Sequence, residues 1–376
     1  MKVLTIGTDR KLFEEGSAVL ARQIAYASKM EEFHIVVCTV SKGLTEKHIG
    51  NLFIYPTNSS SKFGFLMDAY KLGKKIIVQN KFIRGASVIS GQDPFENGLM
   101  AYRLAKKFRL PIQLQLHTDC FSLYFQNSFL NRIRVKIARF LIPRAQGLRV
   151  VSDKIAQSLK QNFPNLKIVP QILPIFVDIQ KIIDAPAETS LRQQFSQFNF
   201  IILMASRLTK EKEIGTALQV LASFVTDFPH TGLIIAGDGP EKKNLERLAQ
   251  TLDISDHVVF VGWQENLIPY FKIANLFLLT SRYEGYGMIL IEAGASGLPI
   301  ITTDVGITGE IFQNGVNSFI CPVGDVSCFS QRVKELISDN AKRELFKRRI
   351  QDSMKSIVIK EDEYTVKYVD ILEKLL

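Results

Sequence analysis

The stretch "SRYEGYGMILIEAGASGLPII", residues 281–301, has the residue types of an anion-binding turn. The apolar run before it predicts a strand that enters a turn containing Gly285 and Gly287, and a helix is predicted from Met288 to Ser296. The first turn of a helix leaves backbone N–H groups unpaired and carries a partial positive charge, and glycines let a ligand approach that backbone. The stretch therefore predicts a phosphate site at the start of this helix.

Two acids, Glu284 and Glu292, lie on either side of that helix start. Their separation corresponds to about 12 Å at about 1.5 Å per helical residue. A nucleoside diphosphate sugar has a comparable reach, with its diphosphate between sugar and ribose, so the two carboxylates could accept hydrogen bonds from hydroxyls at both ends. The alternative is that Glu284 is an exposed turn acid and Glu292 a partly buried helix residue bonded to a neighbour.

A pair of cations follows a predicted strand in "ASRLTKEKEIGTAL". Arg207 offers a planar fork of donors and Lys212 a compact point charge, and together they can neutralise a diphosphate. The alternative is two solvated loop cations. The chain contains no Asp-x-Asp, the acidic pattern that metal-dependent sugar transfer would want, so we expect no metal and no other cofactor.

The first half of the chain contributes two weaker candidates. His117 ends the predicted strand "PIQLQLH", where its imidazole could bond a sugar hydroxyl or a phosphate, although a structural hydrogen-bond donor is the alternative. Gly16 and Ser17 precede a predicted helix and could likewise face an anion, or begin a helix without any ligand.

Strand and helix patterns alternate along the whole chain, which predicts an α/β protein with two doubly wound parallel sheets. In the first half the strands are expected at "KVLTIG", "HIVVCTV", "ASVISGQ", "PIQLQLH" and "GLRVVS", with helices at 16–30, 97–108, 129–141 and 153–162. In the second half they are expected at "NFIILMAS", "TGLIIAG", "HVVFVG", "LFLLTS" and "PIITTD", with helices at 212–227, 240–252, 265–273 and 287–297.

Prolines and a change of charge indicate a seam near residue 180. We expect domains at 1–180 and 181–355, with 356–376 as a C-terminal helix that packs back toward the first domain. Residues 1–177 carry 26 Lys+Arg and 11 Asp+Glu, a net +15, whereas the remainder carries 21 and 26, a net −5. This asymmetry predicts an anionic partner for the first domain.

Composition excludes several classes of protein. No uninterrupted apolar run reaches the roughly 18 residues of a membrane-spanning helix, and the first residues predict a strand rather than a leader, so we expect a cytoplasmic location. The four cysteines are scattered, without the spacing of a zinc set, and are expected to be reduced thiols. Basic residues interleaved with aromatics are not evident, which argues against nucleic acid.

The segment "FLNRIRVKIARFLIP" is predicted to form a basic amphipathic helix. Its apolar stripe comprises Phe129, Leu130, Ile133, Ile137, Phe140 and Leu141, flanked by Arg132, Lys136 and Arg139. Such a helix can lie on an anionic membrane surface. The alternative is that the stripe packs on the sheet of its own domain.

Taken together, "SRYEGYGMILIEAGASGLPIITTD", "ASRLTKEK", "IIAGDGPEKKNLE", "VVFVGW" and "LQLHTD" resemble the retaining glycosyltransferases of family 4. The resemblance implies the GT-B fold, two facing Rossmann-like domains with an interdomain cleft. It covers nearly all of the chain and is most specific over 198–325.

The resemblance also implies roles for the candidate residues. Glu284 would contact the donor sugar, Glu292 the ribose, and Arg207 and Lys212 the diphosphate, together with backbone N–H groups of Tyr286, Gly287, Met288 and Ile289. His117 would lie near the transferred sugar, and Gly16 would belong to the N-terminal glycine loop. The surroundings of Gly262 and Trp263 would help to select the donor.

Three positions depart from the family's pattern. Ser17 stands where many relatives have a second glycine, and Glu213 replaces the glycine that often follows the motif lysine, adding a negative charge near the proposed diphosphate. Ile175 and Phe176 stand where many relatives have an Asn-Gly turn.

The implied activity is that of a metal-independent retaining hexosyltransferase. A UDP-sugar or GDP-sugar would be the donor, and a hydroxyl of a glycan, glycolipid or lipid-linked phosphate in cell-envelope polysaccharide biosynthesis the acceptor. The basic first domain would touch an anionic membrane from the cytoplasmic side. Alternatives are a sugar-nucleotide epimerase or a phosphorylase of the same fold, and a non-catalytic module that binds a nucleotide sugar.

Overall fold

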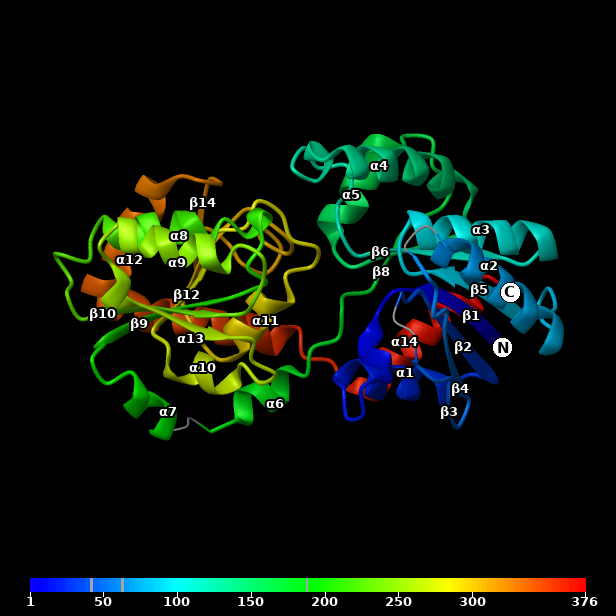
Figure 1. The fold of residues 1–376 in the computed structure, drawn as a ribbon, viewed down its shortest axis with the longest axis horizontal. Helices are drawn as coiled ribbons and strands as arrows, with labels where there is room; N and C mark the ends of the chain where they lie inside the picture. The colour runs from blue at the N-terminus through cyan, green and yellow to red at the C-terminus, as the bar shows by residue number, and fades with distance from the viewer. Residues whose placement is uncertain (41–42, 62–63, 187–188) are drawn as a thin grey trace. The chain divides into compact units, whose positions relative to one another are not determined.

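The chain forms two compact units in a computed structural model that describes residues 1–40, 43–61, 64–186 and 189–376 (Figure 1). Unit 1 comprises Met1–Phe176 and Ile359–Leu376, and unit 2 comprises Val177–Val358. The sequence analysis placed the corresponding divisions near residues 180 and 355.

The core of unit 1 is a sheet of strand order β3-β4-β2-β1-β5-β6-β7-β8, in which every pairing is parallel except that of β3 with β4. The central strands are buried along nearly their whole length, as expected for a parallel sheet covered on both faces. The strands are β1 Lys2–Gly7, β2 Glu32–Val37, β3 Lys47–Ile49, β4 Leu52–Pro56, β5 Ser87–Gly91, β6 Ile112–Leu116, β7 Gly147–Val150 and β8 Gln171–Ile172.

Helices connect these strands and cover the sheet. Three of them begin at serine caps. Ser17 Oγ accepts from Leu20 N at 3.1 Å, Ser128 Oγ from Asn131 N at 3.1 Å and Ser152 Oγ from Ile155 N at 3.3 Å. The helices are α1 Ala18–Ala27, α2 Gly64–Gln79, α3 Glu96–Phe108, α4 Phe129–Leu141, α5 Asp153–Asn162 and α14 Glu361–Glu373, with 3₁₀ turns at Arg10–Phe13, Phe125–Asn127 and Ile142–Arg144.

A buried arginine bonds α14 to the sheet of unit 1. Arg149 on β7 is 5% exposed, and its guanidinium donates to Gln115 Oε1 at 2.9 Å and to Tyr364 Oη at 2.8 Å. The same guanidinium lies 5.3 Å from the ring centroid of Tyr368, which stacks on Tyr26 at 4.0 Å. The last helix of the chain therefore completes the core of the unit in which the chain begins.

Unit 2 contains a six-stranded, fully parallel sheet of order β11-β10-β9-β12-β13-β14. This is the order of a Rossmann fold, in which the direction of winding reverses between β9 and β12 and ligands bind beside the strand ends at that reversal. The strands are β9 Phe200–Ala205, β10 Thr231–Ala236, β11 Val258–Gly262, β12 Leu276–Leu279, β13 Ile300–Thr303 and β14 Ser318–Cys321.

The helices of unit 2 cover both faces of its sheet (Figure 1). They are α6 Ile179–Asp184, α7 Thr189–Gln194, α8 Ile214–Ala222, α9 Lys242–Thr251, α10 Ile268–Ile273, α11 Met288–Ala295, α12 Val326–Ser338 and α13 Asn340–Ser356, with 3₁₀ turns at Lys210–Lys212 and Ser255–His257.

The expected fold class is confirmed, and the elements that the pattern missed are short except for α2, a helix of 16 residues. The strands β3, β4, β8 and β14 and the helices α2, α6 and α7 were not anticipated. β4 alternates buried and half-buried residues because it is the next-to-last strand of the sheet, and α2 carries Gly73 in its interior, where Leu104 packs against it.

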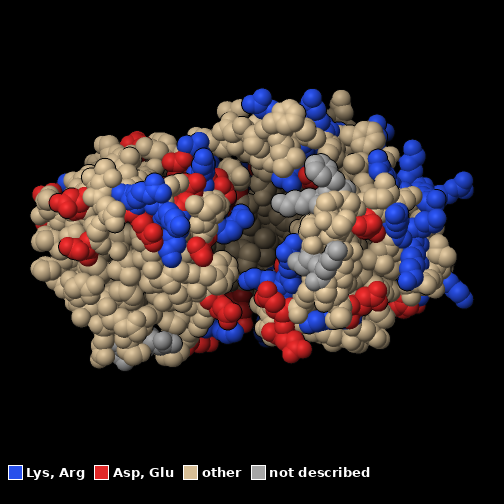
Figure 2. Space-filling view, in the orientation of Figure 1, with Lys and Arg blue, Asp and Glu red and all other residues tan. Residues whose placement is uncertain are grey.

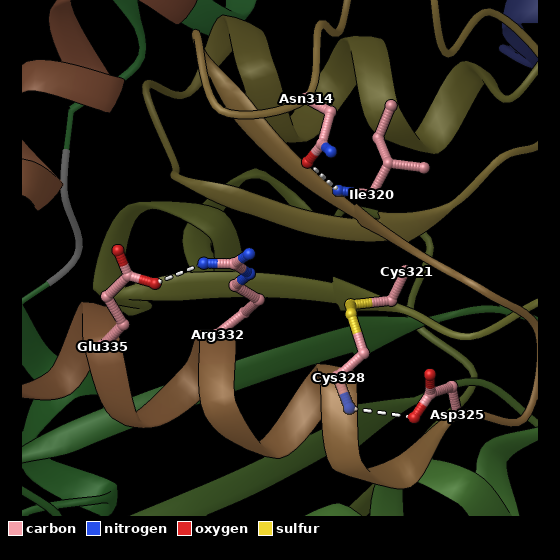
Figure 3. Close-up of a disulfide and its surroundings, with 7 residues drawn as sticks. All are labelled: Asn314, Ile320, Cys321, Asp325, Cys328, Arg332 and Glu335. Atoms are coloured by element: carbon pink, nitrogen blue, oxygen red, sulfur yellow. Dashed lines mark hydrogen bonds and ion pairs between the residues drawn. A yellow bond between two sulfur atoms is a disulfide. The ribbon is translucent and has the colours of Figure 1, made fainter.

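The expectation that all cysteines are reduced thiols is wrong for one pair. Cys321 at the end of β14 and Cys328 in the first turn of α12 form a disulfide with a Cα separation of 5.8 Å (Figure 3). The connecting turn ends at Asp325, whose carboxylate accepts from Cys328 N at 2.9 Å and holds that residue toward the strand. Cys38 and Cys120 are free and buried, and burial raises the pKa of each thiol to about 12.

Candidate active site

Two loops of unit 2, the donor loops, meet where the strand order reverses. Loop 206–213 follows β9 and loop 280–287 follows β12, and the two strands pair directly. Arg282 N donates to Glu211 O at 2.8 Å, and Thr280 Oγ1 donates to the carbonyl oxygens of Lys212 and Glu213 at 3.0 and 2.9 Å. These bonds fix the backbones of the two loops against each other.

A partly buried ion pair lies between the donor loops. Lys212 Nζ is 2.7 and 2.8 Å from the two carboxylate oxygens of Glu284, and Ser281 Oγ donates to Glu284 Oε1 at 2.7 Å. The side chains of Lys212 and Glu284 are 12% and 13% exposed. Glu284 is therefore not an exposed turn acid, and the structure brings two predicted site residues into direct contact although the chain separates them by 72 positions.

The helix start after the second donor loop is open to a ligand. Gly287 has φ +84°, the left-handed backbone that glycine adopts readily, and it caps α11. Gly306 packs on the preceding peptide so closely that a Cβ there would lie 2.5 Å from Tyr286 O. Among the described residues, nothing accepts a hydrogen bond from the N–H groups of Met288 or Ile289. Two backbone donors and the positive end of the helix dipole are thus available to an anion.

Glu292 lies one turn further along α11, and no described residue bonds to its carboxyl group. Burial raises the pKa of this group to about 7. The alternative that a neighbour satisfies it does not hold within the described part of the chain. A carboxyl group near half-protonation can both donate to and accept from the hydroxyls of a ligand.

The other cation, Arg207, is held loosely. Its side chain is 70% exposed, with Nη2 3.8 Å from Glu211 Oε1. The nearby Glu213 adopts φ +50°, a left-handed conformation that glycine takes more readily than other residues. Its carboxylate pairs with Arg282 and accepts from Thr216 Oγ1, which partly offsets its negative charge.

In unit 1, His117 directly follows β6 at the carboxyl edge of the sheet, the edge at which the parallel strands end. Burial, together with the nearby cations of Arg149 and Arg22, lowers the pKa of its imidazole to about 3. The ring is therefore neutral at physiological pH. Among the described residues it has no hydrogen-bond partner, so both ring nitrogens are open to a ligand.

Two glycines predicted to bind the donor lie in turns. Gly16 has φ +76° and precedes Ser17, the cap of α1, while Gly262 ends β11 with φ +71° and accepts from Gly237 N at 2.7 Å. A Cβ at either glycine would meet no atom within 4 Å, so backbone conformation rather than crowding favours glycine there. Gly285 lies in the bend before α11.

Sequence reasoning missed the residues that hold the site together. These are three small polar residues. Ser281 Oγ bonds Glu284 within its own loop, Thr280 Oγ1 bonds the other donor loop, and Thr303 Oγ1, at the end of β13, donates to Ser281 O at 2.6 Å. Gly306 could have been found from the sequence, because a glycine shortly after a predicted strand indicates a turn at the strand end. No group of three or more His, Cys, Asp or Glu side chains in the described ranges is arranged to hold a metal ion.

Comparison with known proteins gives the class of the protein. Residues 188–353 match the family model "Glycosyl transferases group 1". The chain is 28% identical over 285 residues to N-acetyl-alpha-D-glucosaminyl L-malate synthase of Bacillus anthracis, covering 73% of this chain and 72% of that protein. It is 26% identical over 229 residues to alpha-monoglucosyldiacylglycerol synthase of Streptococcus pneumoniae, covering 57% of this chain and 51% of that protein.

A solved structure agrees over the full length. Anabaena HepE in complex with UDP and glucose superposes with a TM-score of 0.77 at 18% identity, covering 100% of both chains. The two Rossmann-like units are thus those of a GT-B protein. The chain is thus similar to the glycosyltransferases of group 1, in sequence over residues 188–353 and in fold over its whole length.

The pH dependence of stability tests the environment of Glu292. Because its folded-state pKa of about 7 exceeds the ordinary value of 4.5, the folded state holds this proton more tightly. The contribution of this group to the free energy of unfolding is greatest below pH 4.5. It is lost as the pH rises to about 7, a decrease of up to about 3 kcal/mol. We expect urea unfolding of Glu292→Gln to show a flatter stability profile between pH 5 and 7.5 than wild type.

The exposed Glu344 on α13 provides the control, because Glu344→Gln removes the same charge in solvent. Its profile should follow that of wild type. Parallel profiles for wild type and Glu292→Gln would contradict a raised pKa.

Proposed function

We propose that the chain is a metal-independent, retaining glycosyltransferase that moves a sugar from a UDP-sugar to an acceptor hydroxyl. The observation that carries the proposal is the arrangement of the donor loops. The Lys212–Glu284 pair and the open N–H groups of Met288 and Ile289 belong to adjacent connections at the strand-order reversal of unit 2.

UDP is proposed as the nucleotide of the donor. HepE, which shares the fold, has been solved with UDP and glucose, and the Bacillus anthracis relative is named for the transfer of an N-acetylglucosaminyl group. A UDP-hexose or its N-acetylated form is therefore the first donor to test, and GDP-sugars are the second.

The proposed roles follow from charge and hydrogen-bonding capacity. Lys212 carries three N–H bonds, of which Glu284 engages some, so its ammonium can also reach the leaving diphosphate. The exposed fork of Arg207 is free to turn toward the same phosphates, and the start of α11 adds two backbone donors. Fixed positive potential at this point stabilises the charge that develops as the nucleotide leaves.

The remaining residues would act on the hydroxyls of the donor. Glu284 is held by Lys212 and Ser281 and would accept from the transferred sugar, while Glu292 would bond the ribose. The neutral imidazole of His117 would bond the sugar from unit 1. For retention, the acceptor attacks from the face that the nucleotide leaves, and the departing phosphate takes the acceptor's proton.

An assay for slow donor hydrolysis tests the proposal. UDP-, GDP- and ADP-sugars are offered in EDTA to wild type, Glu284→Gln and Arg207→Ala, and nucleotide release is measured. We expect release from one UDP-sugar, undiminished by EDTA, and a fall of about 100-fold or more in Glu284→Gln because the positioned carboxylate is lost.

The controls Glu344→Gln and Arg247→Ala make the same charge changes at exposed positions of unit 2 and should leave release unchanged. Release that needs a divalent metal would contradict metal independence. Donor binding without release in any acceptor screen would favour the alternative of a non-catalytic binding module, and donor isomerisation would favour an epimerase.

The acceptor is proposed to lie at an anionic membrane surface, because α4 presents much of its apolar stripe to solvent. Six apolar side chains between residues 123 and 140 are 40% to 83% exposed: Leu123, Tyr124, Phe129, Leu130, Ile133 and Phe140. Ile137 is half-buried and Leu141 buried, and the helix packs on its unit through Val135, Ala138 and Leu141. The predicted helix is confirmed, and the alternative that its whole stripe packs on the sheet is wrong.

Charge on α4 supports an anionic surface. Arg132, Lys136 and Arg139 are exposed on the same helix, so basic groups lie beside the exposed apolar ones. The Streptococcus pneumoniae relative is named for the synthesis of a glucosyl diacylglycerol, a membrane lipid. In the described ranges, no helix is both long and apolar enough to cross a bilayer.

Vesicle flotation tests the α4 surface. Phe129→Ser/Leu130→Ser removes two apolar side chains that are 79% and 52% exposed. We expect binding to phosphatidylglycerol vesicles to weaken about ten-fold or more, because each buried side chain is worth about 1.5 to 3 kcal/mol. The matched variant Val78→Ser/Ile83→Ser changes side chains of unit 1 that are 59% and 61% exposed and should bind as wild type does. Equal losses in both variants would contradict a specific surface.

A further inference from the structure

Unit 1 contains a basic pocket at the sheet edge where the parallel strands begin. Its volume is about 510 Å³, and residues just before or at the start of β5, β6 and β7 line it, namely Gly85, Ile112 and Gln146. Because β5, β6 and β7 are parallel neighbours, their starting ends share one edge, opposite the edge at which His117 lies. The pocket is therefore separate from the candidate active site.

Four cations line this pocket, Arg84, Lys106, Arg109 and Arg144, and none of the described residues in its wall is Asp or Glu. All four are exposed at the rim. The side chains of Arg84, Lys106 and Arg109 have no ion-pair or hydrogen-bond partner among the described residues. The charged side chains of the wall are thus all positive, and a concave surface of this kind concentrates the electrostatic field and attracts a counter-ion.

The fourth cation, Arg144, is already oriented. Its Nη1 donates to Phe140 O at 2.7 Å, and its guanidinium lies 4.1 Å from the ring centroid of Phe140. Tyr102, which also lines the pocket, meets the same ring edge to face at 5.7 Å. This stack holds one arginine fork at the rim with most of its donors unused.

The floor of the pocket is apolar. Ala105, Leu110, Pro111 and Leu375 line it. Leu375 packs closely on Gly147, where a Cβ would lie 2.9 Å from Leu375 Cδ2. An apolar floor under a cationic rim fits a ligand with an anionic group and a less polar remainder. The volume lies within the roughly 300 to 1,000 Å³ of small-molecule sites.

We propose that this pocket binds a phosphate-bearing ligand, either a soluble phosphorylated compound or the headgroup of an anionic phospholipid. Three of its four cations are arginines, whose planar forks match phosphate oxygens in pairs. Lys and Arg gather on the edge of unit 1 near the labels α2, α3 and C in Figure 1, as Figure 2 shows. The proposal does not depend on the proposed sugar transfer.

A comparison of two double variants tests the pocket. Arg84→Gln/Arg109→Gln removes two unpaired cations of the rim, and Lys74→Gln/Lys75→Gln removes two exposed cations of α2 that do not line the pocket. Isothermal titration with inorganic pyrophosphate measures soluble binding, and co-sedimentation with phosphatidylglycerol or phosphatidylcholine vesicles measures lipid binding. α4 is unchanged in both variants, so any vesicle binding through α4 is the same in the two and cancels in the comparison.

For a soluble ligand, wild type and the lysine variant should show two pyrophosphate-binding events, one in the donor loops and one in the pocket, and the arginine variant only one. For a lipid ligand, the arginine variant should bind phosphatidylglycerol vesicles about ten-fold more weakly than the lysine variant, with no difference on phosphatidylcholine. Equal behaviour of the two variants in both assays would overturn the proposal. If pyrophosphate still binds in the pocket but the protein releases no nucleotide from any donor, only the proposed sugar transfer is contradicted.

Discussion

The pairing of β9 with β12 is the constraint on which the candidate site depends. Because the winding of the sheet reverses between these strands, both following loops leave the same edge without a helix crossing between them. Lys212 and Glu284 thereby meet at 2.7 Å, and each charge is neutralised where water is largely excluded. Removing either partner would leave a partly buried charge unpaired, so each residue secures the other's position.

That arrangement also explains where the chain accepts unfavourable backbone conformations. Gly287 takes a left-handed conformation at the start of α11, and Glu213 does so without being glycine. The second case costs about 1 to 2 kcal/mol, which the bonds of its carboxylate to Arg282 and Thr216 offset in part. Both positions lie next to the ion pair, where the backbone has to turn sharply to present donors to a ligand.

The two units use charge differently. In unit 2, Lys212 and Glu284 neutralise each other, and the remaining N–H donor capacity of Lys212 lies beside the start of α11. In unit 1, Arg149 is buried with neutral partners and an aromatic ring instead of a carboxylate, so its charge reaches His117 and helps keep that imidazole neutral. The same arginine bonds α14, so one buried cation both adds to the effect of burial on the pKa of His117 and helps dock the last helix.

Much of the fold could be predicted because apolar runs and helical periods are local signals. Two predicted helices, 129–141 and 153–162, have the observed bounds. The contact of Lys212 with Glu284 could not be predicted from spacing, since it depends on strand order across 72 positions. The Cys321–Cys328 bond depends on how one turn folds. The exposure of Phe129 depends on which face of α4 is left uncovered by the sheet. Amphipathic periodicity shows that an apolar face exists but not what covers it.

Titration of UDP by calorimetry into Lys212→Met and Lys210→Met is the most direct measurement of the central claim. Lys210 lies on the same loop and is exposed, so the two variants remove the same charge within two residues. The account predicts that Lys212→Met weakens UDP binding at least about ten-fold, because the diphosphate loses a charged donor and meets an unpaired Glu284, while Lys210→Met binds nearly as wild type does. Equal affinities for the two variants would contradict it.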